Sequence, residues 1–390
     1  MTNILITGGR APVALELARA FHRAGHTVYM AESLCGHLSQ PSAAIEANFV
    51  VPAPRQETGA FLQALKTIIE QNQIQLLVPT CEEVFHIAKG MADLPCRVFT
   101  EPLEKLDLYH NKWNFAVRAS HFGLRVPDSI LIQNQDDLLH AYAQWRDLVL
   151  KPVYSRFASR TLIRPQLRDA MSMLKFGEPW VAQEFIAGQQ FCSYSVCQNG
   201  RVTAHAVYPT IFTAGQGATI AFQHVEHAAI FNWVRTFVER FNVTGQMSFD
   251  FVQSAGGDVV ALECNPRATS GVHLLASHPQ FVESFFDNST RLASGQVPEI
   301  NCLTPLKNNF QMLASAMLMY GLPESFRKKR LKQWAKTFFA CDDVILDAKD
   351  PLPFLLQFRS LFFYLKLARQ KGITPLEAST FDIEWNGFEN

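Results

Sequence analysis

The chain has 390 residues, of which 48% are hydrophobic and 18% charged, and this composition excludes a disordered or coiled-coil protein. Lys plus Arg and Asp plus Glu both number 35, so the neutral balance argues against a nucleic-acid partner. The length predicts two or three domains. The eight cysteines lack CxxC spacing and the N-terminus lacks a signal sequence, so we expect a soluble, cytoplasmic protein with reduced thiols.

Residues 1–100 alternate short apolar strands with amphipathic helices. A buried strand over residues 3–7 is followed by Gly8-Gly9, and a helix then opens at Pro12 and ends before Gly25. The other strands of this region are expected at residues 27–30, 74–78 and 97–99, with helices between them. This alternation predicts a parallel, doubly wound sheet.

The turn after the first strand is a weak match to a dinucleotide-binding fingerprint. That fingerprint needs glycine at its first, third and sixth positions, which here are Gly8, Arg10 and Val13. Glu32, after the second strand, could hold a ribose, but one carboxylate at a strand end is common. We therefore interpret the turn as a scaffold or substrate-facing element and keep an NAD(P)-dependent oxidoreductase as an alternative.

Two lysines in the middle of the chain lie beside apolar sequence. Lys112 follows a helical stretch that begins near residue 101, and Lys151 ends the short strand at residues 148–150. Another strand, at residues 180–186, ends at Ala187-Gly188. Burying an ammonium group requires an anionic partner, and a phosphate-bearing ligand would be one.

The strongest signal is a hairpin within residues 245–271. Its strands, at residues 248–252 and 258–264, flank Gly256-Gly257, and a two-residue turn there places Asp250 opposite Glu263, barring a bulge. Strand alternation puts Asn265 on the same face as Glu263.

Facing carboxylates repel each other unless something neutralises them. Mg²⁺ prefers oxygen ligands and uses one or two carboxylates together with substrate phosphates. We therefore predict a Mg²⁺ (or Mn²⁺) site at Asp250, Glu263 and Asn265, with the fork of Arg267 placed to hold a transferring phosphoryl group. The alternative is a polar hairpin that faces water.

Residues ~100–290 resemble the ATP-grasp superfamily, in its carbamoyl-phosphate-synthetase-like branch. The matching segments are Asn111-Lys112, Leu150-Lys151-Pro152, the run from Gln183 to Gly188, Phe249-Asp250-Phe251, and the run from Glu263 to Arg267. The resemblance implies an α/β and α+β chain in three parts. These are a doubly wound pre-ATP-grasp domain (1–100), a two-subdomain ATP-grasp domain (101–290) and a mostly helical C-terminal extension of unknown role (291–390).

The resemblance also implies a role for individual residues. In the family pattern, Lys112 and Lys151 would contact the ATP phosphates, and Glu184 with the backbone of Phe185 and Ile186 would bind the adenine. The metal would be held by Asp250, Glu263 and Asn265. The catalytic cations would be Arg267 and Lys151. The implied reaction converts a carboxylate to an acylphosphate, which an amine or similar nucleophile then attacks. A non-catalytic ATP-binding regulatory module is the alternative.

The chain departs from the family pattern at three positions. Gln190 stands where a ribose-binding carboxylate is common, and Asn111 stands where a carboxylate often precedes the first lysine. The flap at residues 154–159 has no glycine, so we expect Ser155 or Arg156 to contact the phosphates instead. Ser270 and His273, just after Arg267, are predicted as possible substrate contacts near the phosphate end of the site.

The C-terminal region contains one helical pattern with an aromatic face, at residues 354–370. That face carries Phe358, Leu361, Phe362, Leu365 and Ala368. We favour its docking on the protein's own core over a membrane surface, because the chain is neutral and shows no second anchor. A homodimer contact is the third interpretation.

Overall fold

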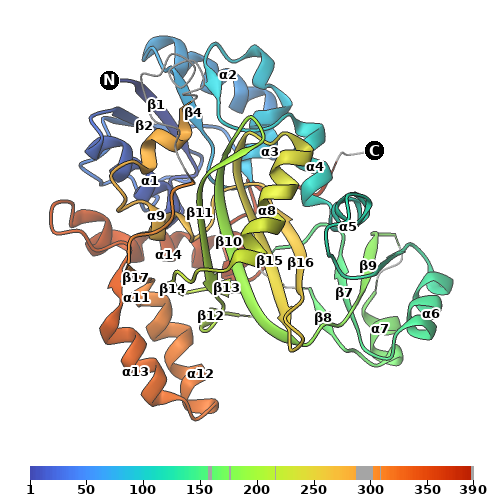
Figure 1. The fold of residues 1–390 in the computed structure, drawn as a ribbon. Helices are drawn as coiled ribbons and strands as arrows, with labels where there is room; N and C mark the ends of the chain where they lie inside the picture. Colours follow the sequence, from blue (N-terminus) through green and yellow to red (C-terminus); the bar gives the residue numbers. More distant parts are fainter. Residues whose placement is uncertain (157–159, 175–176, 216, 287–301, 308, 388–390) are drawn as a thin grey trace.

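The structure is a computed structural model that describes residues 1–156, 160–174, 177–215, 217–286, 302–307 and 309–387. Figure 1 shows an N-terminal parallel sheet, a central antiparallel sheet and a small outer sheet, with helices of the C-terminal region below and behind them. The fold is the expected mixture of α/β and α+β parts.

The N-terminal domain is a parallel sheet with the strand order β3-β2-β1-β4-β5. Its elements are β1 (Asn3–Thr7), α1 (Pro12–Arg23), β2 (Thr27–Glu32), β3 (Ala47–Val50), α2 (Thr58–Gln71), β4 (Leu76–Val78), α3 (Glu83–Lys89), η1 (Met91–Asp93) and β5 (Arg97–Val98). Residues of β1 alternate between the two cores, since Ile4 and Ile6 pack with α1 whereas Leu5 packs with α2. The doubly wound prediction is confirmed.

The outer sheet has the antiparallel order β6-β9-β7-β8. It follows two helices, and the elements of this part are α4 (Leu103–His110), α5 (Lys112–His121), β6 (Ser129–Ile132), α6 (Gln135–Gln144), β7 (Leu148–Pro152), β8 (Leu162–Ile163), α7 (Leu167–Met173) and β9 (Trp180–Glu184). Asn111 caps α5, because its Oδ1 accepts a hydrogen bond from Asn114 N at 2.9 Å. This cap sets the position of Lys112, the first residue of the helix.

The central sheet has the antiparallel order β11-β10-β15-β16. The elements of this part are β10 (Gly188–Gln198), β11 (Arg201–Pro209), β12 (Thr213–Ala214), β13 (Ala218–Thr219), α8 (Ala228–Phe241), β15 (Gly245–Ser254), β16 (Val259–Asn265), α9 (Val272–Leu275) and η2 (Phe281–Phe285). Helix α8 covers one face, where Trp233 and Phe237 pack against Phe249 and Phe251 of β15. The opposite orientation of Asp250 follows from strand alternation.

The hairpin β15–β16 pairs Asp250 with Glu263 as predicted, but its turn is not the predicted one. Ser254 N donates to Asp258 O at 2.9 Å, so three residues, not two, form the loop. That turn alone would shift the register by one residue. A bulge at Leu262 shifts it back, since Phe251 pairs with Ala261 while Asp250 pairs with Glu263.

The C-terminal region is mostly helical, as predicted, although residues 291–301 of the expected extension lie outside the described residues. Its elements, together with the strand β14 that pairs with it, are β14 (Ala221–Gln223), β17 (Phe310–Met312), α11 (Ala314–Ala316), the π-helical turn η3 (Met317–Gly321), α12 (Leu322–Arg327), α13 (Leu331–Ala340), β18 (Asp342–Asp343), α14 (Leu352–Lys371) and α15 (Pro375–Ala378). The three strands form a small sheet in the order β14-β17-β18.

The expectation that the 354–370 helix packs its aromatic face on the core is wrong. In α14, Phe358, Phe362 and Leu365 are 59%, 66% and 49% exposed, whereas Ser360 and Ala368 are buried. The helix instead packs on the protein through these two residues together with Phe354 and Phe363, which lie outside the predicted face. Within the described ranges, no helix combines the length and the apolar character needed to cross a bilayer.

Gly188, at the start of β10, is required by a close backbone contact. A Cβ at this position would lie 2.0 Å from Gln253 O. We expect Gly188→Ala to lower the free energy of unfolding by about 1–3 kcal/mol, because the backbone must shift to relieve this overlap. Gly59→Ala, in α2 and with open space around it, should instead be neutral or stabilising. Urea unfolding of both variants measures the difference, and equal stabilities would contradict the close-contact argument.

Candidate active site

Two buried lysines converge on one carboxylate between the outer and central sheets. Lys112 and Lys151 are 3% and 6% exposed. Their Nζ atoms lie 3.5 Å and 3.9 Å from Glu263 Oε2. The structure thus brings together residues from α5, β7 and β16.

The β-bulge in the hairpin has a direct consequence for Lys151. Leu262, the unpaired residue of the bulge, accepts a hydrogen bond through its carbonyl oxygen from Lys151 Nζ at 3.2 Å. Lys112 Nζ similarly donates to Ser155 O at 3.1 Å. Burial lowers the pKa of Lys151 to about 8, although Glu263 opposes this shift.

The paired carboxylates of Asp250 and Glu263 are in different electrostatic environments. Burial, and then the facing charge of Glu263, raises the pKa of Asp250. Burial also acts to raise the pKa of Glu263, but Lys112 and Lys151 outweigh it, and that pKa is lowered. Among the described residues, no Lys, Arg or His forms an ion pair with Asp250. The charge of Glu263 is therefore offset by two lysines, whereas Asp250 has no such cationic partner among the described residues.

Asn265 and Arg267 extend the polar face of β16 past Glu263. Asn265 Nδ2 donates to Asp250 Oδ2 at 3.5 Å. Arg267 Nη2 donates to Asn265 Oδ1 at 3.3 Å, and its Nη1 donates to Ala268 O at 3.2 Å. The four side chains of Asp250, Glu263, Asn265 and Arg267 thus form one continuous polar surface.

The donor set at Asp250, Glu263 and Asn265 fits a hard divalent cation, because its atoms are carboxylate and amide oxygens and Asp250 lacks a cationic partner. Across the parts of the chain that the structure describes, no three His, Cys, Asp or Glu side chains gather into a metal cluster. An ion of the Mg²⁺ type uses one or two carboxylates and takes its remaining ligands from phosphates and water.

The residues predicted to read adenine lie on the link between β9 and β10. Phe185 N donates to Asp147 O at 3.1 Å, and Glu184 Oε1 accepts from Asp128 N at 3.3 Å. The Ile186 N–H makes no hydrogen bond within the described ranges and is the available donor. Gln190 is exposed in β10 and lies just beyond this link.

The flap residues occupy unexpected positions. Ser155 turns its carbonyl toward Lys112, whereas the Arg156 guanidinium is bound to Glu82 and to Trp385 O, and its Nη1 donates to Asn386 Oδ1 at 2.9 Å. In this arrangement the Arg156 guanidinium is bound by Glu82 and by the C-terminal residues Trp385 and Asn386. Residues 157–159 of the predicted flap lie outside the described residues.

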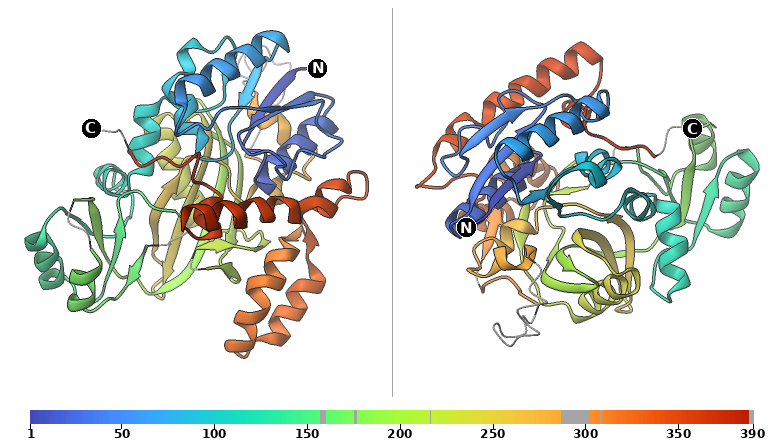
Figure 2. Two further views of the ribbon diagram at one scale, coloured as in Figure 1. Left: turned by 180° about the vertical axis from the view of Figure 1, so that it is seen from behind. Right: turned by 90° about the horizontal axis from the view of Figure 1, so that it is seen from above.

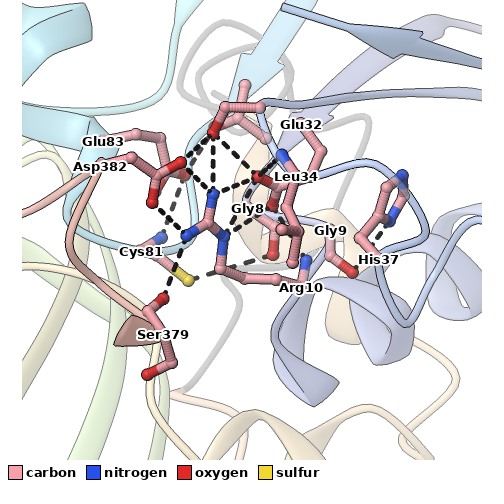
Figure 3. A network of polar contacts seen from close by, with 12 residues as sticks. Gly8, Gly9, Arg10, Glu32, Leu34, His37, Cys81, Glu83, Ser379 and Asp382 are labelled. Atoms are coloured by element: carbon pink, nitrogen blue, oxygen red, sulfur yellow. Dashed lines mark hydrogen bonds and ion pairs between the residues drawn. The ribbon is translucent and has the colours of Figure 1, made fainter. Parts of the chain in front are cut away.

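Arg156 is held in this position by a C-terminal segment, residues 379–386, which we call the strap. The same strap reaches the N-terminal sheet, where Arg10 is held between Glu32 and Asp382 (Figure 3). Arg10 Nη1 also donates to Ser379 O at 3.0 Å. Glu32, the candidate ribose ligand of the oxidoreductase alternative, is therefore occupied by a buried ion pair.

Ser270 and His273 lie on the α1 side of the central sheet. His273 is buried in α9, its Nδ1 lies 3.3 Å from Glu16 Oε2 of α1, and its ring stacks on Phe222. It lines a cavity of about 520 Å³ together with Arg19 and Asp342. Ser270 O accepts the backbone N–H of His273 at 3.1 Å. No contact among the described residues joins either side chain to the Asp250–Glu263 pair.

The sequence interpretation did not single out three buried or partly buried groups on which the charge of Arg267 acts. The Arg267 charge acts on Cys81 and Glu82, which follow β4, and on His110, at the end of α4. His110 is 3% exposed, its Nε2 has no hydrogen-bond partner in the described structure, and burial lowers its pKa to about 3. Adjacent carboxylates directly after a buried strand, Glu82-Glu83, were the available signal.

The strap is anchored by Trp385. Its ring stacks on Phe85 with centroids 5.8 Å apart, and its Nε1 donates to Asp107 Oδ1 at 2.8 Å. We expect Trp385→Ala to lower the free energy of unfolding by about 3–5 kcal/mol, as for other buried aromatic truncations. Phe339→Ala, which removes a ring that is 84% exposed, should change it by less than about 0.5 kcal/mol. Chemical denaturation compares them, and a neutral Trp385→Ala would show that the strap is not anchored there.

Comparison with known proteins supports the family resemblance. Residues 109–271 match the family model of an ATP-grasp domain, whereas no curated protein matches the sequence. The fold is similar to an ADP complex of N5-carboxyaminoimidazole ribonucleotide synthetase, with a TM-score of 0.61, 14% identity, and coverage of 78% of this chain and 80% of that one.

Two further solved structures share this fold. Biotin carboxylase from Campylobacter jejuni, as a β,γ-ATP complex, has a TM-score of 0.58 at 14% identity, with 73% of this chain and 72% of that chain covered. L-amino acid ligase from Bacillus licheniformis has a TM-score of 0.56 at 14% identity, with coverage of 71% and 70%. Residues 109–271 therefore match the model of an ATP-grasp domain, and these solved structures share the fold of the chain.

Proposed function

We propose that the protein is an ATP-dependent ligase that joins a small carboxylate to an amine or similar nucleophile. The observation that carries the proposal is the convergence of two buried lysines on Glu263, which faces Asp250, within an ATP-grasp domain. The two buried lysines can bind a phosphate chain, and Asp250, which has no cationic partner of its own among the described residues, can bind the metal that accompanies it. Together they are a preorganised site for a metal-bound triphosphate.

Lys112 and Lys151 would bind the phosphates of ATP, and the Ile186 N–H and the Glu184 side chain would bind adenine. Both lysines already lie next to the carboxylate of Glu263. A triphosphate could take the place of this carboxylate as their anionic partner, or share them with it, so that neither buried ammonium group is left unpaired. The solved relatives bound to ADP or an ATP analogue support nucleotide binding.

Asp250, Glu263 and Asn265 would hold Mg²⁺ (or Mn²⁺), which supplies electrostatic stabilisation of the phosphates when it is bound. Arg267, held by Asn265, would stabilise charge on the transferring phosphoryl group. The acid substrate would attack the γ-phosphorus to release ADP, and the nucleophile would then displace phosphate from the acylphosphate.

The experiment has two stages. ATP binding in the presence of Mg²⁺ is first measured by calorimetry, and ADP release is then followed across a panel of carboxylates paired with amines. The proposal predicts ADP release that requires both an acid and a nucleophile. Binding of ATP without turnover on a broad panel would instead favour the non-catalytic regulatory module, for which the capture of Arg156 by the strap is the specific structural support. Binding of NAD(P)H but not ATP would favour the oxidoreductase alternative.

A further inference from the structure

The C-terminal helices present an exposed surface that combines apolar and basic side chains. On α14 it comprises Leu355, Phe358, Phe362, Leu365, Lys366 and Arg369, all of which are exposed. We propose that this basic apolar surface, together with the α12–α13 hairpin, binds the face of an anionic phospholipid bilayer. The proposal is independent of the ligase activity.

Helix α14 is apolar on its outer side as well as on its inner side. Its 20 residues cover a length of about 30 Å, and Phe354 and Phe363 contact the protein while Leu355, Phe358, Phe362 and Leu365 are exposed. Figure 2 shows the helix lying across the outside of the molecule, on the side opposite to the view in Figure 1. It contains four Lys or Arg residues and no acidic residue.

The α12–α13 hairpin supplies a second anchor of the same character. It projects from the body beyond α14 (Figure 2), and it exposes Phe326 and Phe339 to 63% and 84%. Residues 322–340 contain six Lys or Arg residues and one acidic residue, Glu324. Two separated apolar and basic elements are what a stable but reversible attachment to a membrane surface requires.

The charge of this surface contrasts with that of the rest of the chain. The hairpin and α14 together carry a net charge of +9 in a chain whose net charge is zero. The link between them contains four aspartates, but these are directed elsewhere: Asp350 binds Arg19 of α1, and Asp342, Asp343 and Asp347 line the cavity beside α1. No ion pair among the described residues involves Lys366 or Arg369.

These features favour a bilayer over a second copy of the chain. A symmetric dimer through this surface would place two strongly positive patches against each other, which is unfavourable. In a bilayer, the apolar rings enter the boundary of the acyl chains, while the interleaved Lys and Arg heads remain at the lipid phosphates. The negative charge that this basic surface binds is therefore that of the lipid headgroups.

The test uses the full chain with vesicles of phosphatidylcholine alone or with about one third phosphatidylglycerol. We expect co-flotation with the anionic vesicles only, and release when salt is raised from about 0.1 to about 0.5 M. Phe358→Ser with Phe362→Ser should reduce the bound fraction about tenfold, as should Lys366→Glu with Arg369→Glu. All four side chains are exposed, so folding should be unaffected, and circular dichroism verifies this.

Matched controls remove similar groups elsewhere. Met173→Ser takes an apolar side chain that is 56% exposed from α7, and Lys89→Glu with Arg118→Glu changes exposed charges on α3 and α5. These variants should bind anionic vesicles like the wild-type chain. Binding that is absent, equal on neutral vesicles or unchanged in the α14 variants would overturn the proposal. Sedimentation that shows a dimer broken by the two Phe substitutions, without vesicle binding, would assign the surface to self-association instead.

Discussion

Glu263→Gln is expected to lower the rate of ATP turnover by about a thousandfold or more while leaving the protein folded. Gln keeps the volume of the side chain but removes the negative charge that faces Asp250 and contacts both lysines. Steady-state ADP release measures the loss. ATP affinity should change by less than about tenfold, because both lysines remain to bind the phosphates.

Two controls separate this effect from a general defect. Glu239→Gln removes an exposed carboxylate from α8 and should leave turnover unchanged. Cys264→Ala alters the next residue of β16, which is buried on the opposite face, and should lower stability but retain turnover. A Glu263→Gln enzyme of wild-type activity would show that this carboxylate does not take part in the reaction.

Lys151→Met is expected to weaken ATP binding by about 10- to 100-fold, the value of a charge-assisted hydrogen bond to phosphate. The residue is 6% exposed and already makes its polar contacts inside the cleft. Isothermal titration calorimetry measures the affinity. Lys89→Met, on the exposed side of α3, is the matched control and should bind ATP normally.

The same lysine predicts a pH dependence with a defined sign. Burial lowers the pKa of Lys151 from 10.5 to about 8, so the cationic form predominates below pH 8 and is lost above it. ATP affinity of the wild-type chain should therefore fall as pH rises through about 8, whereas Lys151→Arg should keep a flat profile. In the free protein the unfolded chain binds more protons between the two pKa values, so the contribution of this group to folding stability rises over that range. An identical pH profile for the wild type and Lys151→Arg would contradict the assignment.

Much of the architecture could be predicted because its signals are local. The alternation of strands and helices in residues 1–100, Pro12 at the start of α1 and the two lysines beside apolar strands all follow from neighbouring residues. The predicted pairing of Asp250 with Glu263 was also correct, but only because two unpredicted features cancel each other. The loop is one residue longer than predicted, and the bulge at Leu262 restores the register.

The bulge could not be read from the sequence, yet it directs the Leu262 carbonyl to Lys151. Leu262 is an ordinary strand residue, and only the three-dimensional pairing of β15 with β16 shows that it has no partner. A register argument from turn length alone therefore identified the right carboxylates without explaining the position of the lysine.

The strap and the orientation of α14 were missed for a different reason. Arg10 and Asp382 are separated by 372 residues, and no periodicity or motif connects positions so distant. For α14, the pattern showed an apolar face, but a hydrophobic face indicates only that something covers it. The structure instead packs Phe354 and Phe363 inward, together with the small residues Ser360 and Ala368.

The most direct measurement is a crystal structure of the chain with Mn²⁺ and a non-hydrolysable ATP analogue, in which the anomalous signal locates the metal. We expect the Mn²⁺ peak to lie between the carboxylates of Asp250 and Glu263, with the triphosphate on Lys112 and Lys151. A metal bound away from this pair, or a triphosphate that contacts neither lysine, would contradict the proposed site.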